Sequence, residues 1–362
     1  MLSDIEQWVR LAKLELSAKK AVSLVDYFGD PAEVFSAPVN ELKSAGAIGD
    51  KTAERIHDAA STSVDEEMKA LDNIGARVVT IRDDEYPANL RQIYDPPPVL
   101  FVKGELHEED CFAVGIVGTR RPSEYGRSMA MKISRDLAAR GLTVISGGAR
   151  GIDTTVHTAA VSVGRTIAIL GSGLDVPYPY ENRGLFKRIT DAGAIMSEYV
   201  PGTQPDGYRF PARNRLISGM SLGVLIVESL VTGGAMITAR MAEEQNRDVW
   251  AIPGGTDNEL SEGPHRLIRD GAKLVERAED ILEEIGVTVE HTSDRRERPT
   301  IPDNITPEQK TVLQALSLHP KHVDDIIAEC GLSASVANST LTLLEMLSLV
   351  RRVPGNSYVR AV

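Results

Sequence analysis

Residues 112–153 read FAVGIVGTRRPSEYGRSMAMKISRDLAARGLTVISGGARGID and contain the pattern that decides the fold. Two short apolar runs, Phe112–Val117 and Leu142–Ile145, flank a helical stretch near Glu124–Arg140. The apolar runs are continuous, which is typical of strands buried on both faces of a sheet. Because glycines and a helix separate the two strands, the order predicts parallel strands joined by helical crossovers.

The same alternation continues along the chain. Further strands are expected at residues 166–170, 194–196, 224–227 and 249–252, with helices from 154, near 181–191, from 211 and from 235. We therefore predict an α/β fold with a Rossmann-like, doubly wound and mostly parallel sheet over residues 76–290. The proline-rich segment Tyr86–Leu100 is expected to be an extended lead-in, because prolines are poorly tolerated in a central strand.

A smaller domain is expected on the N-terminal side of the sheet. Residues 1–75 carry apolar side chains at helical spacing and predict a small helical domain, SAM-like or helix-hairpin-helix-like. Residues 45–56 resemble a degraded helix-hairpin-helix, with Ala47 in place of the usual first glycine. Direct DNA contact and a packing or partner-binding role both remain open for this segment.

The end of the chain predicts a winged-helix domain. Residues 291–304, HTSDRRERPTIPDN, are polar and charged and indicate a linker. In residues 305–362, three helical patterns precede a hairpin with a turn at Pro354-Gly355-Asn356. The candidate recognition helix, Ser333–Met346, contains no Lys or Arg. We therefore expect this domain to contact a protein or to play a helper role rather than to read duplex DNA.

Composition places the chain among folded proteins of a reducing compartment. Its 362 residues are 42% hydrophobic and 25% charged, which suits two or three domains. Cys111 and Cys330 are the only cysteines and lack metal-ligand spacing, so neither a disulfide framework nor a zinc site is expected. The N-terminus lacks a signal-peptide pattern, and no apolar run is long enough to span a bilayer. We expect a cytoplasmic protein with no cofactor, no metal and no membrane contact.

Charge is distributed unevenly along the chain. The formal net charge is -12, yet the segment Cys111–Arg215 holds 14 basic and 8 acidic residues. An acidic protein with one basic segment is able to hold a polyanion in a local groove while repelling it elsewhere. The middle of the chain is therefore where an anionic ligand is expected.

Three glycine-rich elements follow three of the predicted strands: Gly115–Ser123, Ser146–Asp153 and Thr232–Thr238. In a doubly wound sheet, the ligand crevice lies at the carboxyl ends of the strands. Bare backbone there lets amides face an anion at the start of a helix, and Arg120 and Arg150 add fixed charge. Together the three elements favour phosphate binding over three unrelated tight turns.

The stretch Arg209–Arg215, RFPARNR, combines three guanidiniums, an amide and an aromatic ring. Guanidinium forks match phosphate oxygens, and an exposed aromatic face stacks on bases of any identity. The stretch therefore predicts a site for single-stranded nucleic acid in which Phe210 stacks on a base. The cations expected to neutralise phosphates are Arg120, Arg150, Arg213 and Arg215. The competing interpretation is a buried arginine cluster paired with acids such as Glu228.

Five motifs together resemble the DNA-processing protein A family, also called DprA or Smf. They are GIVGTRRPSEYG, SGGARGID, PYPYEN, FPARNR and the PGG after the last predicted strand. The resemblance is dense over residues 80–290, and both flanking domains resemble those of family members. The third glycine loop departs from the family, because Gly233-Gly234-Ala235-Met236 stands where Ser-Gly-Ser-Leu is more common.

The resemblance implies a recombination mediator rather than an enzyme. Such a protein binds single-stranded DNA without strong sequence preference, dimerises through its Rossmann-like domain, and loads the RecA recombinase in natural transformation and DNA uptake. The residues expected to bind nucleic acid, from their chemistry and from the resemblance together, are Gly118, Thr119, Arg120, Ser146, Gly147, Gly148, Arg150, Arg209, Phe210, Arg213, Asn214 and Arg215.

Two other functions remain open. Pro253–Glu259 shares the first glycines of the PGGxGTxxE signature of nucleotide N-glycosidases but lacks its GT and its spaced glutamate. A transcription regulator that reads duplex DNA through the winged helix is the other alternative. Asp153 and His157 lie one helical turn apart, but the sequence places no nucleophile beside them, so Asp153 is expected to be a helix N-cap.

Overall fold

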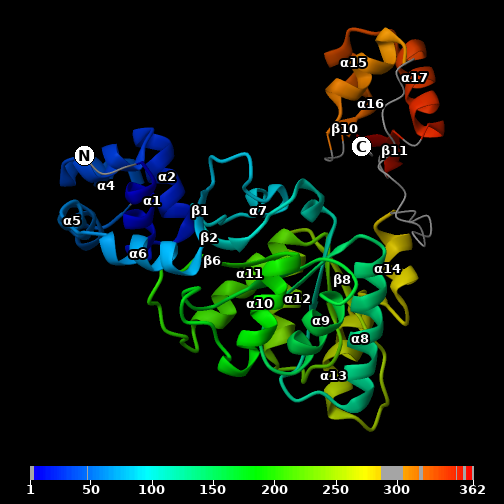
Figure 1. The fold of residues 1–362 in the computed structure, drawn as a ribbon, viewed down its shortest axis with the longest axis horizontal. Coiled ribbons are helices and arrows are strands. Elements are labelled where there is room, and N and C mark those ends of the chain that lie inside the picture. Colours follow the sequence, from blue (N-terminus) through cyan, green and yellow to red (C-terminus); the bar gives the residue numbers. More distant parts are fainter. Residues whose placement is uncertain are drawn as a thin grey trace. The chain divides into compact units, whose positions relative to one another are not determined.

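The computed structural model describes residues 4–46, 48–286, 305–317, 321–347, 349–353 and 356–360 (Figure 1). The predicted linker, residues 291–304, lies outside the described residues. The chain divides into two compact units, residues 1–278 and residues 279–362. Within the described ranges, no helix is both long enough and apolar enough to cross a membrane.

A nine-stranded sheet forms the centre of the first unit, in the order β1-β2-β6-β5-β4-β3-β7-β8-β9. Neighbouring strands from β6 to β9 in this order are parallel, whereas β2 is antiparallel to both β1 and β6. The bounds are β1 Arg77–Thr80, β2 Val99–Gly104, β3 Ala113–Val117, β4 Thr143–Ser146, β5 Thr166–Ile169, β6 Ala194–Ser197, β7 Gly223–Ile226, β8 Asp248–Ala251 and β9 Lys273–Leu274. The predicted Rossmann-like, mostly parallel sheet is confirmed.

The continuous apolar strands reflect burial on both faces. In β5, Ile167 and Ile169 belong to one core cluster, and Ala168 between them belongs to another. Successive side chains of a strand point to opposite faces, so two clusters at alternate positions require cover on both sides. This is the physical reason that the strands of the parallel core could be recognised from sequence.

The last residues of the proline-rich segment Tyr86–Leu100 form a strand. The sequence predicts an extended lead-in and no central strand there, but Val99 and Leu100 begin β2, which pairs with β1 on one side and β6 on the other. The prolines at 96–98 stand before the ladder rather than inside it. They therefore remove no hydrogen bond from the strand, which resolves the conflict between proline content and strand formation.

Helices cover both faces of the sheet (Figure 1). Leu216 and Ile217 of α11 and Ala239 of α12 pack in the cluster that contains Ile167, whereas Phe186 of α10 packs in the other. The helices of this region are α7 Ala88–Arg91, α8 Glu124–Ala139, α9 Ile152–Ala160, α10 Arg183–Ala192, α11 Arg209–Met220, α12 Gly234–Glu244 and α13 Glu262–Arg269. The helix α14, Ala278–Glu284, begins at the last residue of the first unit and continues into the second.

The residues before the sheet form short helices, in agreement with the predicted helical domain. They are α1 Asp4–Lys13, α2 Ala18–Phe28, α3 Pro31–Ser36, α4 Val39–Gly46, α5 Asp50–Ala59 and α6 Asp65–Ile74. The segment that resembles a helix-hairpin-helix corresponds to α4 and α5, and its Ala47 lies outside the described residues.

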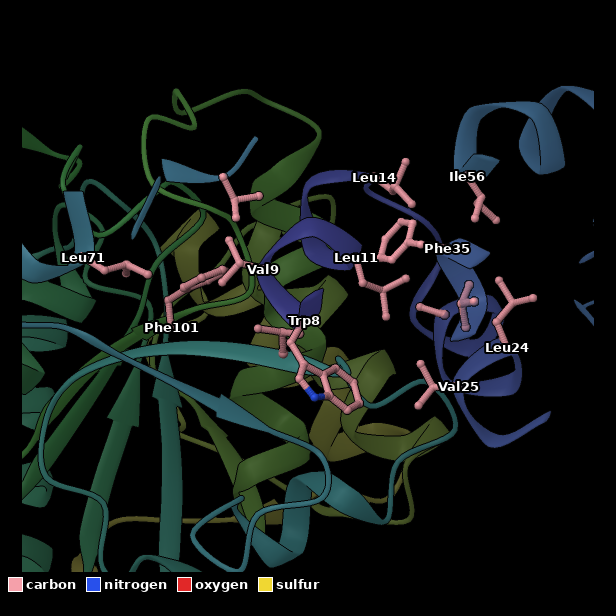
Figure 2. Packing of buried hydrophobic residues seen from close by; sticks show 14 of the residues in the cluster. Trp8, Val9, Leu11, Leu14, Leu24, Val25, Phe35, Ile56, Leu71 and Phe101 are labelled. Atoms are coloured by element: carbon pink, nitrogen blue, oxygen red, sulfur yellow. The ribbon is translucent and has the colours of Figure 1, made fainter. Parts of the chain in front are cut away.

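The helical domain and the sheet share one apolar core. Trp8 and Leu11 of α1 and Leu24 of α2 are buried in a cluster that Phe101 of β2 joins (Figure 2). Asp30 fixes the entry to α3, because its carboxylate accepts a hydrogen bond from the Ala32 amide at 2.6 Å. The helical domain therefore packs directly on the sheet.

The second unit contains the predicted winged helix. Its elements are α15 Pro307–Ala315, β10 Lys321–His322, α16 Val323–Cys330, α17 Ala334–Met346, β11 Val350–Val353 and β12 Ser357–Arg360. The strands form a small sheet in the order β10-β12-β11. On α17, the candidate recognition helix, Val336, Leu343 and Met346 are exposed. The other exposed side chains of α17 include Asn338, Thr342 and Glu345, so its surface is mixed apolar and polar and carries no basic residue.

A glycine pair tests how tightly β2 is fitted into the sheet. Gly104 has φ +95°, and a Cβ there would overlap the carbonyl oxygen of Gly193, whereas a Cβ on Gly184 of α10 would meet no atom within 4 Å. We expect Gly104→Ala to lower the free energy of unfolding by about 2 kcal/mol or more, since left-handed backbone and overlap both oppose it. Gly184→Ala is the matched control and is expected to be neutral or stabilising by up to about 1 kcal/mol. Urea unfolding of the two variants measures both values, and equal midpoints would contradict the expectation.

Candidate nucleic-acid interface

A groove lies at the carboxyl ends of β3 and β7, the neighbouring strands from which the chain winds in opposite directions. This is the switch point at which open α/β sheets bind ligands. The groove has a volume of about 530 Å³ and is bordered by the loop after β3, the loop after β7 and the first half of α11. Three segments far apart in sequence therefore meet at one edge of the sheet.

Half of the predicted residues line this groove. They are Gly118, Thr119, Arg120, Phe210, Arg213 and Asn214. A smaller adjoining hollow shares Arg120, Phe210 and Arg213 with the groove and adds Gly147 and Arg150. The two hollows are continuous through their shared residues, so the first two glycine loops and the RFPARNR stretch converge as expected.

Arg209 and Arg215 are not brought to this groove. They line a separate cavity of about 290 Å³ between the helical domain and the sheet. The reason is helical phase: Phe210, Arg213, Asn214 and Ile217 share one face of α11, and Arg209, Ala212 and Arg215 share another.

Carboxylates occupy both of these guanidiniums. Arg209 forms an ion pair with Glu15 of the helical domain at 2.9 Å. Arg215 forms one with Asp95 at 3.3 Å and another with Glu198. The expectation that Arg215 faces solvent as a phosphate ligand therefore disagrees with its surroundings, and for these two residues the competing picture of arginines paired with acids fits the structure.

Phe210 is the aromatic centre of the groove. The guanidinium carbon of Arg120 lies 5.3 Å from the centroid of its ring, and the ring of Tyr178 lies 5.7 Å away at an angle of 35°. Arg120 is exposed and Phe210 is partly exposed. A cation beside an aromatic face that retains solvent access is the arrangement that stacks and pairs with a nucleotide.

Two tyrosines of the PYPYEN motif extend this aromatic surface. Tyr178 is 39% exposed, and Tyr180 in the short helix η2 (Tyr180–Asn182) is 72% exposed, with Arg183 over its ring at 4.6 Å. The segment is anchored by Asn182, whose amide donates hydrogen bonds to the Gly148 carbonyl at 2.9 Å and to Thr154. None of the residues of this motif is among those predicted from sequence to bind nucleic acid. The pair of tyrosines beside a proline turn is the sequence feature that could have indicated a surface role.

Arg213 lies beneath the groove rather than within it. Its side chain is 4% exposed and donates to the carbonyl of Ile169 at the end of β5. A Cβ on Gly147 would overlap this guanidinium, so the second glycine loop needs glycine there to admit it. Burial lowers the pKa of Arg213 to about 10, opposed by the negative charge of Asp153. Arg213 therefore supplies a fixed positive charge at neutral pH.

The second glycine loop bonds to its own chain. The Asp153 carboxylate accepts hydrogen bonds from the amides of Gly147 and Ala149, both at 3.2 Å, so it does not cap α9 as expected. Ser146 is fully buried and donates to the Ile116 carbonyl. Burial raises the pKa of Asp153 and the charge of Arg213 lowers it, and the net shift is upward. These contacts shape the wall of the site and occupy two of the amides that were expected to face an anion.

The backbone amides best placed to donate hydrogen bonds to an anion belong to the third glycine loop. Gly234 and Ala235 line the groove at the start of α12, whereas the amide of Gly233 before them donates to the Leu230 carbonyl at 2.9 Å. The first amides of a helix have no carbonyl partner within the helix, and their dipoles favour negative charge. At the start of α8, in contrast, the Glu228 carboxylate already accepts from the Ser123 amide at 2.9 Å. The sequence predicts this loop as the third glycine-rich element, but none of its residues is among those predicted to bind nucleic acid.

His157 is buried and is not among the residues that line the groove. Its side chain is fully buried, and Nδ1 lies 2.8 Å from the hydroxyl of Thr166. Burial lowers its pKa to about 3, assisted by the charge of Arg213. Among the described residues, no group of three or more His, Cys, Asp or Glu side chains could hold a metal ion.

The buried state of His157 predicts a pH dependence of stability. The pKa of His157 is about 3 in the folded chain against its ordinary value of 6.5, so between these pH values the unfolded chain binds one more proton. Stability is therefore retained above pH 6.5 and lost as pH falls, by up to ~1.4 kcal/mol per pH unit. His157→Gln is expected to be less stable at neutral pH but to show a shallower acid decline. Urea unfolding from pH 5 to 7.5 measures this, and parallel curves for the two proteins would refute it.

Known proteins with similar sequences and structures identify the family. The model of the DNA recombination-mediator protein A family matches residues 77–286, and that of the DprA winged-helix domain matches residues 296–356. Protein Smf of Escherichia coli is 33% identical over 99% of this chain and 96% of its own length.

Two solved structures extend the comparison. The X-ray structure of DNA processing protein A from Streptococcus pneumoniae has 35% identity and a TM-score of 0.68, covering 78% of this chain and 98% of that one. The Helicobacter pylori protein, solved to study its single-stranded DNA binding mode, has 28% identity and a TM-score of 0.52, covering 57% of this chain and 95% of that one. From its motifs, its fold and these matches, the chain belongs to the DNA recombination-mediator protein A family, known as DprA or Smf.

Proposed function

We propose that this protein binds single-stranded DNA in the groove between β3, β7 and α11, without strong sequence preference, and delivers it to the RecA recombinase. It acts in DNA uptake and recombination as a mediator, and performs no chemistry on the strand. We further propose that it is cytoplasmic and forms a homodimer through its Rossmann-like domain. Family membership supports these proposals, as does the single-stranded DNA binding mode described for the Helicobacter pylori relative.

The observation that carries the proposal is the chemistry of the groove lining. An exposed cation, an accessible aromatic ring and the amides at the start of α12 gather in one place, represented by Arg120, Phe210 and Gly234. Asp153 is the one acidic residue among the lining residues, and its carboxylate is held by two amides. Such a lining offers donors and a stacking face to a polyanion with unpaired bases.

Neither alternative function gains support from the geometry. The Pro253–Glu259 loop follows β8 and is not among the residues that line the groove, so it does not complete a nucleotide N-glycosidase site there. For a duplex-reading regulator, α17 offers exposed Leu343 and Met346 and no basic residue. Duplex recognition normally requires cations on the recognition helix.

Phe210→Ala tests the stacking role. Loss of one base–aromatic stack costs ~1–3 kcal/mol, so we expect affinity for oligothymidylate to fall roughly 5- to 150-fold. Fluorescence anisotropy with single-stranded, duplex and mononucleotide ligands measures the change and the ligand class together. Tyr94→Ala is the control, since Tyr94 is 77% exposed and lies outside the groove. If the Phe210 variant and the wild type bind oligothymidylate equally well, the groove is not the binding site.

Arg120→Gln tests the phosphate role. Each lost phosphate contact lowers the slope of log affinity against log salt by ~0.7 for single strands, and Arg120→Gln is expected to do so for every sequence tested. Arg135→Gln on the exposed side of α8 is the matched control and is expected to keep the wild-type slope. Titration of oligothymidylate from 50 to 300 mM salt gives both slopes. A wild-type slope in Arg120→Gln would show that this guanidinium touches no phosphate.

A further inference from the structure

The two faces of α11 serve different parts of the molecule. Phe210 and Asn214 face the groove, whereas Arg209 and Arg215 face the cavity beside the helical domain. One helix of twelve residues thus carries the stacking ring and, one residue away, the guanidinium that contacts the helical domain. Because a helix moves as a rigid element, any displacement of its first turns moves both faces together.

Arg209 is held on several sides. Its guanidinium carbon lies 4.7 Å from the ring centroid of Tyr199 and 4.9 Å from that of Tyr208, and its Nη2 is paired with Glu15 at 2.9 Å. The side chain is 12% exposed. A phosphate could reach this guanidinium only by displacing these partners.

Glu15 is itself held in an unusual backbone conformation. It lies between α1 and α2 with φ +46°, in the left-handed region that residues other than glycine rarely adopt. Such conformations persist when the surrounding structure requires them. The turn therefore presents the carboxylate to α11 at a local cost in backbone energy.

Arg215 anchors the same helix two turns further along. Its side chain is 13% exposed and lies between Asp95 and the largely buried Glu198. Beside these ion pairs is the cavity of about 290 Å³. Within the part of the chain that the structure describes, Arg209 Nε and Nη1 and Arg215 Nη1 have no hydrogen-bond partner. Of these ion pairs, that of Arg209 with Glu15 joins α11 to the helical domain, whereas Asp95 and Glu198 stand beside β2 and β6 and tie the helix to the sheet.

We propose that Arg209 and Arg215 are positioning residues, which hold α11 through Glu15 and Glu198, and that the Arg209–Glu15 pair couples the helical domain to the single-stranded DNA groove. The proposal rests on the proposed function, because its effect is on DNA binding. It gives the helical domain a role: through Glu15 it sets the placement of Phe210. A partner that moved the helical domain would change the affinity of the groove without touching it.

This role and a direct phosphate contact by Arg209 predict opposite results for Glu15→Gln. If Arg209 bound phosphate, removing its competing carboxylate would tighten binding and steepen the salt dependence by ~0.7 in log–log slope. If Arg209 positions α11, loss of the ion pair loosens the helix, and binding weakens with the slope unchanged. Glu15 is half-exposed, so the substitution is expected to leave the fold intact.

The experiment measures oligothymidylate affinity against salt for the full chain. We expect Glu15→Gln to bind about three- to tenfold more weakly with the wild-type salt dependence. We expect the affinity of Arg209→Glu to fall about tenfold or more. The reversed pair, Glu15→Arg with Arg209→Glu, is expected to return within about threefold of wild type, because it restores the ion pair. Glu33→Gln, which removes an exposed carboxylate elsewhere on the helical domain, is the control and is expected to bind as wild type.

Two results would overturn the proposal. One is unchanged or tighter binding by Glu15→Gln, and the other is a reversed pair that binds no better than Arg209→Glu alone. Thermal unfolding of each variant shows whether it is folded, and Glu15→Gln decides the question if Arg209→Glu is not. The Phe210→Ala variant shows which proposal has failed. If Phe210→Ala binds as wild type, the groove is not the DNA site and the proposed function fails. If Phe210→Ala binds more weakly, the groove assignment stands and only the coupling to the helical domain is in question.

Discussion

The buried guanidinium of Arg213 is the interaction on which the groove depends. It bonds to the carbonyl at the end of β5, lies against Gly147, and is balanced electrostatically by Asp153. A strand end, a glycine loop and α11 are thereby fixed to one another. A charge with a pKa near 10 in such burial needs a preformed surrounding, because an unpaired buried cation is costly. These contacts preorganise one wall of the groove, and a preorganised site loses less entropy when a ligand binds.

The same helix that fixes the groove also joins two domains. Leu216 and Ile217 of α11 pack against the sheet, and the polar positions around them divide between the groove and the helical domain. A stretch with three arginines within seven residues thus has one guanidinium under the groove and two in ion pairs at the domain boundary. The density of cations in a sequence does not by itself measure the positive charge available to a ligand.

Sequence could predict the sheet because each strand of its parallel core is buried on both faces, and it could predict the convergence of the loops because parallel strands end at one edge. It could not assign Arg209 and Arg215 to the domain boundary. That assignment depends on which face of α11 each arginine occupies and on the position of Glu15, which lies 194 residues before Arg209 in the chain. Nor could it show that Asp153 occupies the Gly147 and Ala149 amides, since the carboxylate turns back into its own loop. Side-chain pairing across distant segments was the missing information.

A net charge of -12 and a site for a polyanion are compatible because the carboxylates around the groove are already bound. Asp153 is held by amides, and Glu228 by Ser123. A carboxylate that accepts hydrogen bonds from the protein has its charge directed toward those donors, and its field at the groove is reduced accordingly. Arg120 remains exposed at the edge, where a strand would meet it first, and Arg150 is exposed but paired with Glu181. The placement of these hydrogen-bonded acids, rather than the overall charge, determines where the surface of this protein suits a polyanion.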